Sequence, residues 1–192
     1  MKKIILISIF ILISALSAQA NEIKRIFVGN ESAKISIIAF ESLTCSYCAK
    51  FHQDVYPLLK KEFLDTGLAK IEFRHFPLDI AAFNASKVAQ CTNDGNLEIL
   101  ESLYANQQKW VKGSSIEEAN INLQKFLSKE GFNIDFESCI NNKQIEDFVL
   151  NDRIDGAKNF KVNATPTIII NNEKFEKTLN YKNLKKALEK LI

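Results

Sequence analysis

The sequence predicts an α/β protein with a central mixed sheet, divided by a long helical insertion. Two observations support this fold class. Residues 34–76 show the order strand, helix, strand, which is typical of a βαβ unit with parallel strands. Residues 79–160 then show helical spacing without a strand, before residues 165–176 return to the pattern of a strand and a hairpin. A chain of 192 residues, 46% of them hydrophobic, suits one domain with such an insertion.

The first half of the predicted fold contains three strands, with one helix between the second and the third. Residues 34–40 form a short, nearly continuous apolar run, which predicts a buried central strand, and residues 21–28 predict a weaker edge strand. Apolar residues then recur at helical spacing up to Gly67, the predicted stop of the helix. They are Phe51, Val55, Leu58, Leu59, Phe63 and Leu64. Residues 69–76 alternate with period two, as a strand does.

The second half is expected to be helical first and then to complete the sheet. Ser115, followed by two glutamates, predicts a capped helix start inside the insertion. Residues 165–170 form another apolar strand, and Asn171-Asn172 can turn it into a hairpin. Residues 181–192 predict a closing helix with its leucines facing inward. The helical stretches predicted in the insertion are 80–93, 97–108, 115–128 and 142–159.

The first twenty residues have the three-part anatomy of a secretory signal peptide. Lys2 and Lys3 form a basic start, residues 4–16 an apolar run, and Ala18-Gln19-Ala20 a small-x-small cleavage site. The run is shorter than the ~20 residues that span a bilayer, so we expect cleavage before Asn21 and no stable membrane anchor. The expected location of the mature protein is the periplasm.

The charge balance of the mature chain disfavours a nucleic-acid-binding protein. Removing Lys2 and Lys3 from the 25 basic residues leaves 23, against 23 acidic residues. No basic surplus remains for nucleic acid or anionic lipid. Export also matters for the four cysteines, because disulfides persist in an oxidising compartment.

Cys45-Ser46-Tyr47-Cys48 directly follows the predicted central strand and begins the amphipathic helix. A CxxC motif next to a βαβ pattern indicates thiol-disulfide chemistry. The helix N-terminus presents unpaired N–H groups and the positive end of its dipole, and both favour a thiolate. We therefore expect Cys45 to be the exposed nucleophile and Cys48 the resolving cysteine, with Thr44 as a candidate helix cap.

Two other interpretations of this motif compete. A zinc site needs two more Cys or His ligands at suitable spacing, and His52 and His75 are the only histidines. A purely structural disulfide between residues three apart closes almost no loop, so it adds little stability. The order of strand, motif and helix favours redox chemistry, which needs no metal or organic cofactor.

Thr165-Pro166 at the start of the last apolar strand is the second signal. Proline is unfavourable inside a sheet, so its position there indicates a special peptide bond. A cis bond would bring the Thr165 backbone beside the cysteines, where its main-chain groups can hold an extended peptide. The alternative is an ordinary trans proline that opens an edge strand.

Together these motifs resemble the DsbA family, periplasmic dithiol oxidases with a thioredoxin fold interrupted by a helical domain. The resemblance covers nearly the whole mature chain and includes the phrase Phe76-Pro77-Leu78-Asp79 after the second strand. It implies donation of the Cys45–Cys48 disulfide to unfolded or folding exported proteins with free cysteines, and reoxidation by a quinone-linked membrane oxidase. The implied organisation is a signal peptide (1–20), two halves of the thioredoxin fold (21–78 and 161–192) and the helical insertion (79–160).

The chain departs from the family pattern at two places. Ser46-Tyr47 replaces the Pro-His found between the cysteines of the most oxidising members, so we expect a milder oxidant. The acidic residue that usually stands six positions before the first cysteine, for proton transfer to the buried thiol, is replaced by Ala39. Glu41 is nearby, but its use in that role is expected to require a bend or a water.

Cys91 and Cys139 lie in the predicted insertion, 48 residues apart. Some branches of the family carry an additional disulfide there, which implies a structural bridge in this chain. The alternative is two buried free thiols that pack as small apolar groups. The oxidising compartment favours the bridge.

Other polar and aromatic residues receive structural interpretations. His52, one helical turn after Cys48, is expected to be a solvated helix residue, with a place at the active-site surface as the alternative. His75 is expected to be a hydrogen-bonded structural histidine. Trp110, Tyr104 and Phe126 are expected to pack the helical insertion. Three rival functions remain: a disulfide isomerase or reductase with the same residues, a cytochrome-maturation thioredoxin, and a peptide-binding chaperone whose CxxC is vestigial.

Overall fold

A five-stranded mixed sheet forms the centre of the molecule, with the strand order β1-β3-β2-β4-β5. The strands are β1 (Ile26–Gly29), β2 (Ile35–Glu41), β3 (Ala69–His75), β4 (Thr167–Ile170) and β5 (Glu173–Lys174). Only the pair β2–β3 is parallel among these ladders. The computed structural model describes residues 22–192, so the predicted signal peptide (1–20) lies outside the described residues. The predicted α/β class with a mixed sheet and a helical insertion is confirmed.

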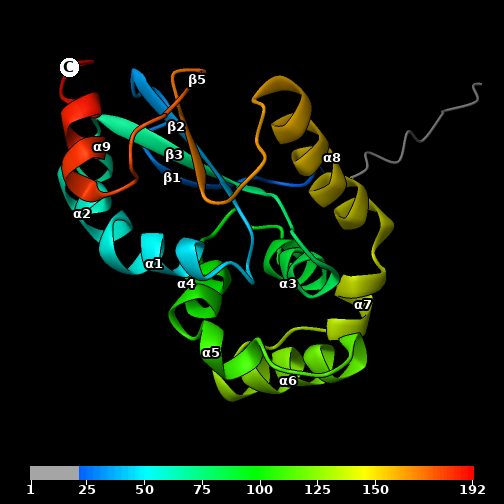
Figure 1. Cartoon of the computed structure of the whole chain (residues 1–192). Helices are drawn as coiled ribbons and strands as arrows, with labels where there is room; N and C mark the ends of the chain where they lie inside the picture. The colour runs from blue at the N-terminus through cyan, green and yellow to red at the C-terminus, as the bar shows by residue number, and fades with distance from the viewer. Residues whose placement is uncertain (1–21) are drawn as a thin grey trace, which may run out of the picture.

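The helices cover both faces of the sheet and one of its ends (Figure 1). One side carries α1 (Ser46–Asp54), α2 (Tyr56–Leu59), the π-helix η1 (Lys60–Leu64) and α9 (Tyr181–Leu188). All insertion helices lie between β3 and β4 in the chain, and the last of them, α8, crosses the other side of the sheet. They are α3 (Ile80–Gln90), α4 (Glu98–Ala105), α5 (Gln107–Trp110), α6 (Ile116–Lys129), α7 (Phe136–Asn141) and α8 (Lys143–Asn159). Within residues 22–192, no helix combines the length and the apolar character needed to cross a membrane.

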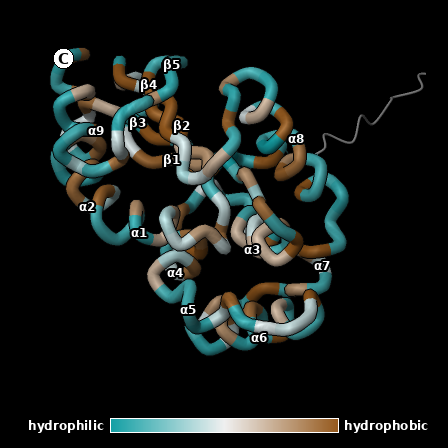
Figure 2. The backbone as a smooth tube through the Cα atoms, viewed as in Figure 1, coloured by the Kyte–Doolittle hydropathy of each residue, from teal (hydrophilic) through white to brown (hydrophobic). Residues whose placement is uncertain are grey.

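The central strand β2 is apolar on both faces because each face contributes to a core. Ile37 and Ala39 belong to the larger core, and Ile38 and Phe40 to a smaller one. In Figure 2 the strands contain many hydrophobic residues, whereas the helices around them also carry long hydrophilic stretches. Gly156 lets α8 approach the smaller core, since a Cβ at this position would lie 2.8 Å from the Phe40 ring.

Helix boundaries differ from the sequence predictions where local features interrupt the apolar periodicity. The helix predicted up to Gly67 is divided into α1, α2 and η1. Pro57, in the first turn of α2, has no N–H to continue the hydrogen bonds of α1, which explains the break. The stretch predicted at 97–108 is likewise two helices separated at Asn106, and α7 was not predicted. Its six residues are too few for a periodic signal, although Asp135 caps the helix by accepting from the Ser138 N–H.

Two local predictions about caps and turns are confirmed. The Ser115 side chain accepts from the Glu118 N–H at the start of α6. Asn171 and Asn172 both have positive φ, at 47° and 68°, and they form the turn between β4 and β5. Asparagine tolerates this left-handed region better than other non-glycine residues.

The three arginines of the chain attach α8 to the sheet and its flanking loops. Arg25 pairs with Asp152, which is fully buried in α8, and Arg74 donates to Asp155 at 2.6 Å. Arg153 of α8 donates to the Pro77 carbonyl at 3.1 Å. These contacts hold the returning end of the insertion against β3 and the segment that follows it.

Candidate active site

The CxxC motif lies where β2 ends and α1 begins. Cys45 is the N-cap residue of α1, with extended backbone angles, and Cys48 lies in its first turn. Cys45 is partly exposed, whereas Cys48 is completely buried, and the two sulfurs are not bonded to each other. The geometry presents one reduced sulfur to solvent and keeps its partner inside the protein.

Several groups around the Cys45 sulfur favour its ionised form. The largest effect is a hydrogen bond from the Cys48 thiol, which lowers the pKa of Cys45 to about 5 against the opposing effect of burial. The Thr165 hydroxyl and the backbone N–H groups of Cys48 and Tyr47 contribute to the same lowering, and the value of about 5 includes all of these effects. Thiolates at helix N-termini are stabilised in this way, and the thiolate is the nucleophilic form of cysteine.

Cys48 has the opposite tendency. Burial raises the pKa of its thiol far above the usual range, because a charged sulfur is poorly solvated inside the core. The hydrogen bond to Cys45 and the negative charge of Glu41 raise it further. Neutral pH therefore leaves Cys48 as a thiol while Cys45 is ionised.

The loop before β4 contacts Cys45 directly. The carbonyl oxygen of Thr165 lies 3.3 Å from Cys45 Sγ, and the Thr165–Pro166 peptide bond is cis. The Thr165 hydroxyl is buried and bonds to no nitrogen or oxygen among residues 22–192, so the Cys45 sulfur is the partner left to it. A residue contributed from far along the chain thus completes the environment of the exposed sulfur.

The two residues between the cysteines face outward. The Tyr47 side chain is 73% exposed and, with Phe51, Pro166, Leu179 and Tyr181, lines a groove of about 480 Å³ beside the cysteines. Ser46 is exposed on the other side of α1, where it lines a second, more polar cleft. Cys45 is therefore flanked by an apolar groove and a polar cleft.

Glu41 belongs to the surroundings of Cys48. Glu41 is the last residue of β2 and shares a face with Ala39, because side chains two positions apart in a strand point the same way. It is 3% exposed, and its negative charge raises the pKa of Cys48. The Glu41 carboxylate thus influences the buried cysteine, although it stands two residues after Ala39, the position that is usually acidic in the family.

The expectation that His52 is solvated was wrong. His52 is 9% exposed, and its Nε2 lies 2.8 Å from Glu41 Oε2. It stands four residues after Cys48 and therefore on the same face of α1. Its ring stacks on Tyr104 of α4, with centroids 4.2 Å apart and an interplanar angle of 18°.

The insertion contributes to the site in a way that the sequence analysis missed. Tyr104 was assigned to insertion packing, but it contacts His52 below the cysteines, whereas Trp110 is buried and donates to the Leu103 carbonyl. Gln107 of α5 was not singled out. Its Nε2 donates to the carbonyls of Leu43 and Cys45 at 2.9 and 3.0 Å, so it fixes the loop that carries Cys45.

Thr44 does not cap α1, contrary to expectation. Cys45 occupies the N-cap position without a side-chain cap, and the Thr44 hydroxyl donates to Asp79 Oδ2 at 2.6 Å. Asp79 in turn caps α3 by accepting from the Ala82 N–H. The Thr44 hydroxyl therefore does not compete with the Cys45 sulfur for the backbone N–H groups of Tyr47 and Cys48.

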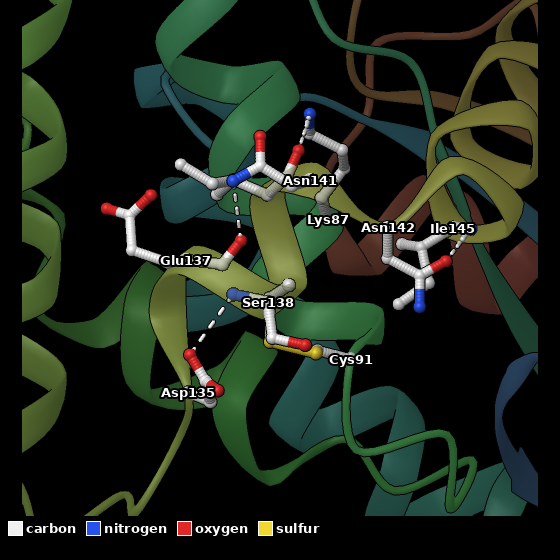
Figure 3. The surroundings of a disulfide bond; sticks show 10 residues. Lys87, Cys91, Asp135, Glu137, Ser138, Asn141, Asn142 and Ile145 are labelled. Atoms are coloured by element: carbon white, nitrogen blue, oxygen red, sulfur yellow. Dashed lines mark hydrogen bonds between the residues drawn. A yellow bond between two sulfur atoms is a disulfide. The ribbon is translucent and has the colours of Figure 1, made fainter.

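The other two cysteines form a disulfide within the helical insertion (Figure 3). Cys91 follows the C-terminal end of α3 and Cys139 lies in α7, with Cα atoms 5.5 Å apart. Lys87, one turn earlier in α3, donates to the Ile140 carbonyl beside the bridge. The bridge thus joins the beginning of the insertion to its last third.

The remaining predicted residues have structural contacts. His75 is buried and its Nε2 lies 3.2 Å from Gln90 Oε1, as expected of a structural histidine. Burial lowers the pKa of His75, so this ring stays neutral near pH 7. Within residues 22–192, no group of three or more His, Cys, Asp and Glu side chains could hold a metal ion.

Solved structures of known proteins share this architecture. The alpha-DsbA1 structure from Wolbachia pipientis is 26% identical, with a TM-score of 0.77, and the match covers 87% of this chain and 90% of that chain. The Chlamydia trachomatis DsbA structure, 22% identical with a TM-score of 0.72, covers 87% of this chain and 91% of that one, and shows likeness of fold.

Sequence relatives carry related names. A Rickettsia typhi protein named as a protein-disulfide oxidoreductase is 25% identical over 171 residues, or 86% of this chain. The match spans 61% of that relative's own length. Disulfide bond formation protein D of Bacillus subtilis is 26% identical over 174 residues, which are 85% of this chain and 75% of the relative.

A family profile gives the broadest match. The family described as thioredoxin matches residues 21–190, which include both halves of the sheet and the whole helical insertion. The chain therefore belongs to the thioredoxin family, and its fold is of the DsbA type.

Proposed function

We propose that this protein is an exported thiol-disulfide oxidoreductase that introduces disulfide bonds into other exported proteins through Cys45 and Cys48. Export is inferred from the signal-peptide pattern of residues 1–20, and the proposed location is the periplasm. The names of the relatives support the reaction class.

The opposite ionisation of the two cysteines is the observation that carries this proposal. The pKa of Cys45 is lowered to about 5, mainly by the Cys48 thiol, whereas burial raises the pKa of Cys48. A stabilised Cys45 thiolate makes the reduced pair more stable, so the oxidised pair is a good disulfide donor. It also makes Cys45 a good leaving group at the end of the reaction.

The proposed reaction is two successive thiol-disulfide exchanges. A substrate thiolate attacks Cys45 Sγ of the oxidised pair, a mixed disulfide forms, and the electron pair of the broken bond passes to Cys48. A second substrate thiolate then attacks the substrate sulfur of the mixed disulfide, and Cys45 leaves as a thiolate. The substrate gains one disulfide, and the protein gains two electrons on its cysteines.

The groove beside Cys45 suits a polypeptide substrate. Its lining is mainly apolar and aromatic, with Tyr47, Phe51 and Leu179 among the lining residues. Residues of this kind are exposed in unfolded proteins and are buried after folding. Thr165 lies at one edge of the groove, and once Cys45 is oxidised and has no S–H to donate, the Thr165 carbonyl is free to accept from an extended segment.

Catalytic turnover requires that the reduced cysteines be oxidised again. We propose that a quinone-linked membrane oxidase accepts the two electrons, as the resemblance to the DsbA family implies. The exchange chemistry itself uses only sulfur and protons, so no metal or organic cofactor of this chain takes part in the proposal.

The redox equilibrium of the Cys45–Cys48 pair with glutathione tests the direction of this reaction. We expect a potential above about −200 mV, more oxidising than thioredoxin at about −270 mV. Alkylation of the free thiols, followed by mass spectrometry, measures the oxidised fraction. A value near that of thioredoxin would contradict an oxidase and favour a reductase.

A variant separates an enzyme from a peptide-binding chaperone. Cys45→Ser removes the nucleophile with little change in volume, and we expect it to lose oxidation of a dithiol peptide while circular dichroism stays unchanged. Wild-type protein should also oxidise the peptide without rearranging a scrambled disulfide substrate faster than glutathione does. Retained function in Cys45→Ser would exclude the redox role.

A further inference from the structure

The buried position of Cys48 creates a requirement that the cysteines alone do not meet. When Cys48 leaves during the first exchange, its sulfur carries a negative charge inside the core, where a charge is poorly solvated. Cys48 is completely buried, so bulk water does not reach it directly in this structure. A neighbouring group must therefore bring the proton that neutralises it.

Glu41 and His52 are the pair of titratable side chains placed to supply this proton. Glu41 acts electrostatically on Cys48 and is itself 3% exposed. Its Oε2 lies 2.8 Å from Nε2 of His52. The second ring nitrogen of His52, Nδ1, is buried and has no hydrogen-bond partner among residues 22–192.

His52 also borders the polar cleft on the far side of α1. This cleft has a volume of about 600 Å³ and lies between α1 and the α4–α5 segment of the insertion. Ser46, Gln53, Glu101 and Gln107 are among its other lining residues. His52 thus contacts Glu41 through Nε2 and is also one of the residues that line this cleft.

The other titratable groups around His52 are less suited to carry a proton. Burial raises the pKa of Tyr56 and of Tyr104, so both phenols stay neutral. Glu101 is on the exposed side of α4, and Lys50 is paired with Asp54. Lys109 borders the cleft and is exposed. An imidazole, in contrast, can accept a proton on one nitrogen and release one from the other.

We propose that His52 passes protons between Glu41 and the water of this cleft, and so supplies the buried Cys48. In the first exchange, one proton of the Glu41–His52 pair goes to the Cys48 sulfur as that sulfur leaves Cys45. The pair then regains a proton from the cleft. When the cysteines are oxidised again, the Cys48 thiol returns its proton to the pair and attacks the mixed disulfide. His52 acts through Glu41, so it is a positioning and proton-transfer residue, and the inference rests on the proposed function.

Chemical rescue tests this role. His52→Ala removes the ring and enlarges the cleft, and we expect reduction of its oxidised cysteines by dithiothreitol to be at least ~10-fold slower than in wild type. Added imidazole should enter the space and restore most of the rate. Stopped-flow mixing, acid quench and alkylation measure the rate across the neutral pH range.

Two further variants distinguish proton transfer from packing. His52→Gln preserves a hydrogen bond to Glu41 but cannot relay a proton, so we expect a similarly slow rate without imidazole rescue. His75→Gln changes the other histidine, which is paired with Gln90, and we expect the wild-type rate. Wild-type rates in His52→Gln, or a slow His52→Ala that imidazole does not restore, would overturn the inference.

The same variants keep this test separate from that of the proposed function. Alkylation of reduced His52→Gln should still find a reactive Cys45 thiolate, because the groups that stabilise it remain in place. If the wild-type protein did not oxidise the dithiol peptide, the proposed function would be rejected. A wild-type rate in His52→Gln together with normal peptide oxidation would reject only the relay.

Discussion

The carbonyl oxygen of Thr165 lies 3.3 Å from the Sγ of Cys45, although 120 residues separate the two in sequence. The contact joins the two halves of the thioredoxin fold, which the helical insertion separates in sequence. The reactivity of Cys45 therefore depends on correct assembly of the whole domain, and local sequence around the motif accounts for only part of it.

Removal of the Thr165 hydroxyl should weaken the Cys45 thiolate. Thr165→Val preserves the shape of the side chain but removes a group that lowers the pKa of Cys45. We expect the pKa of Cys45 to rise, and the pH profile of iodoacetamide alkylation measures it. Thr178→Val is the matched control, because Thr178 lines the same groove but is not among the groups that shift Cys45. If Thr165→Val and Thr178→Val had the same pH profile of alkylation, the Thr165 hydroxyl would not be a group that lowers the pKa of Cys45.

The stability of the reduced protein should depend on pH through Cys45. The folded pKa is about 5, whereas an unfolded cysteine titrates near ~8.5. Between these values the unfolded chain binds more protons, so the contribution to stability rises with pH and is lost as pH falls through about 5. Urea unfolding of reduced wild type and Cys45→Ser should show a difference that grows with pH in this window. A constant difference would argue against a thiolate in the folded state.

The ion pair between Arg25 and Asp152 should hold α8 in place. Asp152 is fully buried and also accepts from the His75 N–H at 3.1 Å, so Asp152→Asn removes the buried carboxylate from Arg25, which keeps only Glu72 at 3.1 Å. We expect a loss of about 2–3 kcal/mol, below the usual range for a fully buried pair because Arg25 is partly exposed. Thermal unfolding measures it, with Asp147→Asn as the exposed control, for which a change within about 0.5 kcal/mol is expected. Similar effects of both substitutions would count against this role.

The Cys91–Cys139 disulfide should stabilise the protein without controlling the exchange reaction. The bridge closes a loop of 48 residues, and loop entropy predicts a contribution of about 3–4 kcal/mol. The double variant Cys91→Ser/Cys139→Ser is expected to unfold at lower urea concentration and to retain the wild-type reactivity of Cys45. A large change in Cys45 alkylation with unaltered stability would reverse this assignment.

The fold was predictable because its signals are local and repeated along the chain. The apolar run of β2, the alternation in β3 and the apolar strand β4 each fix one part of the sheet. The long stretch of helical spacing between β3 and β4 identified the insertion. Breaks such as the one at Pro57 were missed because apolar periodicity continues across them.

The buried groups below the cysteines were only partly predictable. His52 follows Cys48 and Phe51 at helical spacing, so the sequence did contain a signal that it lies on the buried face of α1. The parity of β2 likewise directs Glu41 to the same side as Ala39. Tyr104 and Gln107 reach the site from α4 and α5, and nothing in their local sequence indicates which tertiary neighbour they contact.

Direct titration of the Cys45 thiol tests the central claim most closely. The ultraviolet absorbance of the thiolate in the reduced protein, with Cys45→Ser as the blank, reports the ionisation of this sulfur alone. The structure predicts a midpoint at about pH 5, well below that of a free cysteine. A midpoint at or above the ordinary value of ~8.5 would contradict the account.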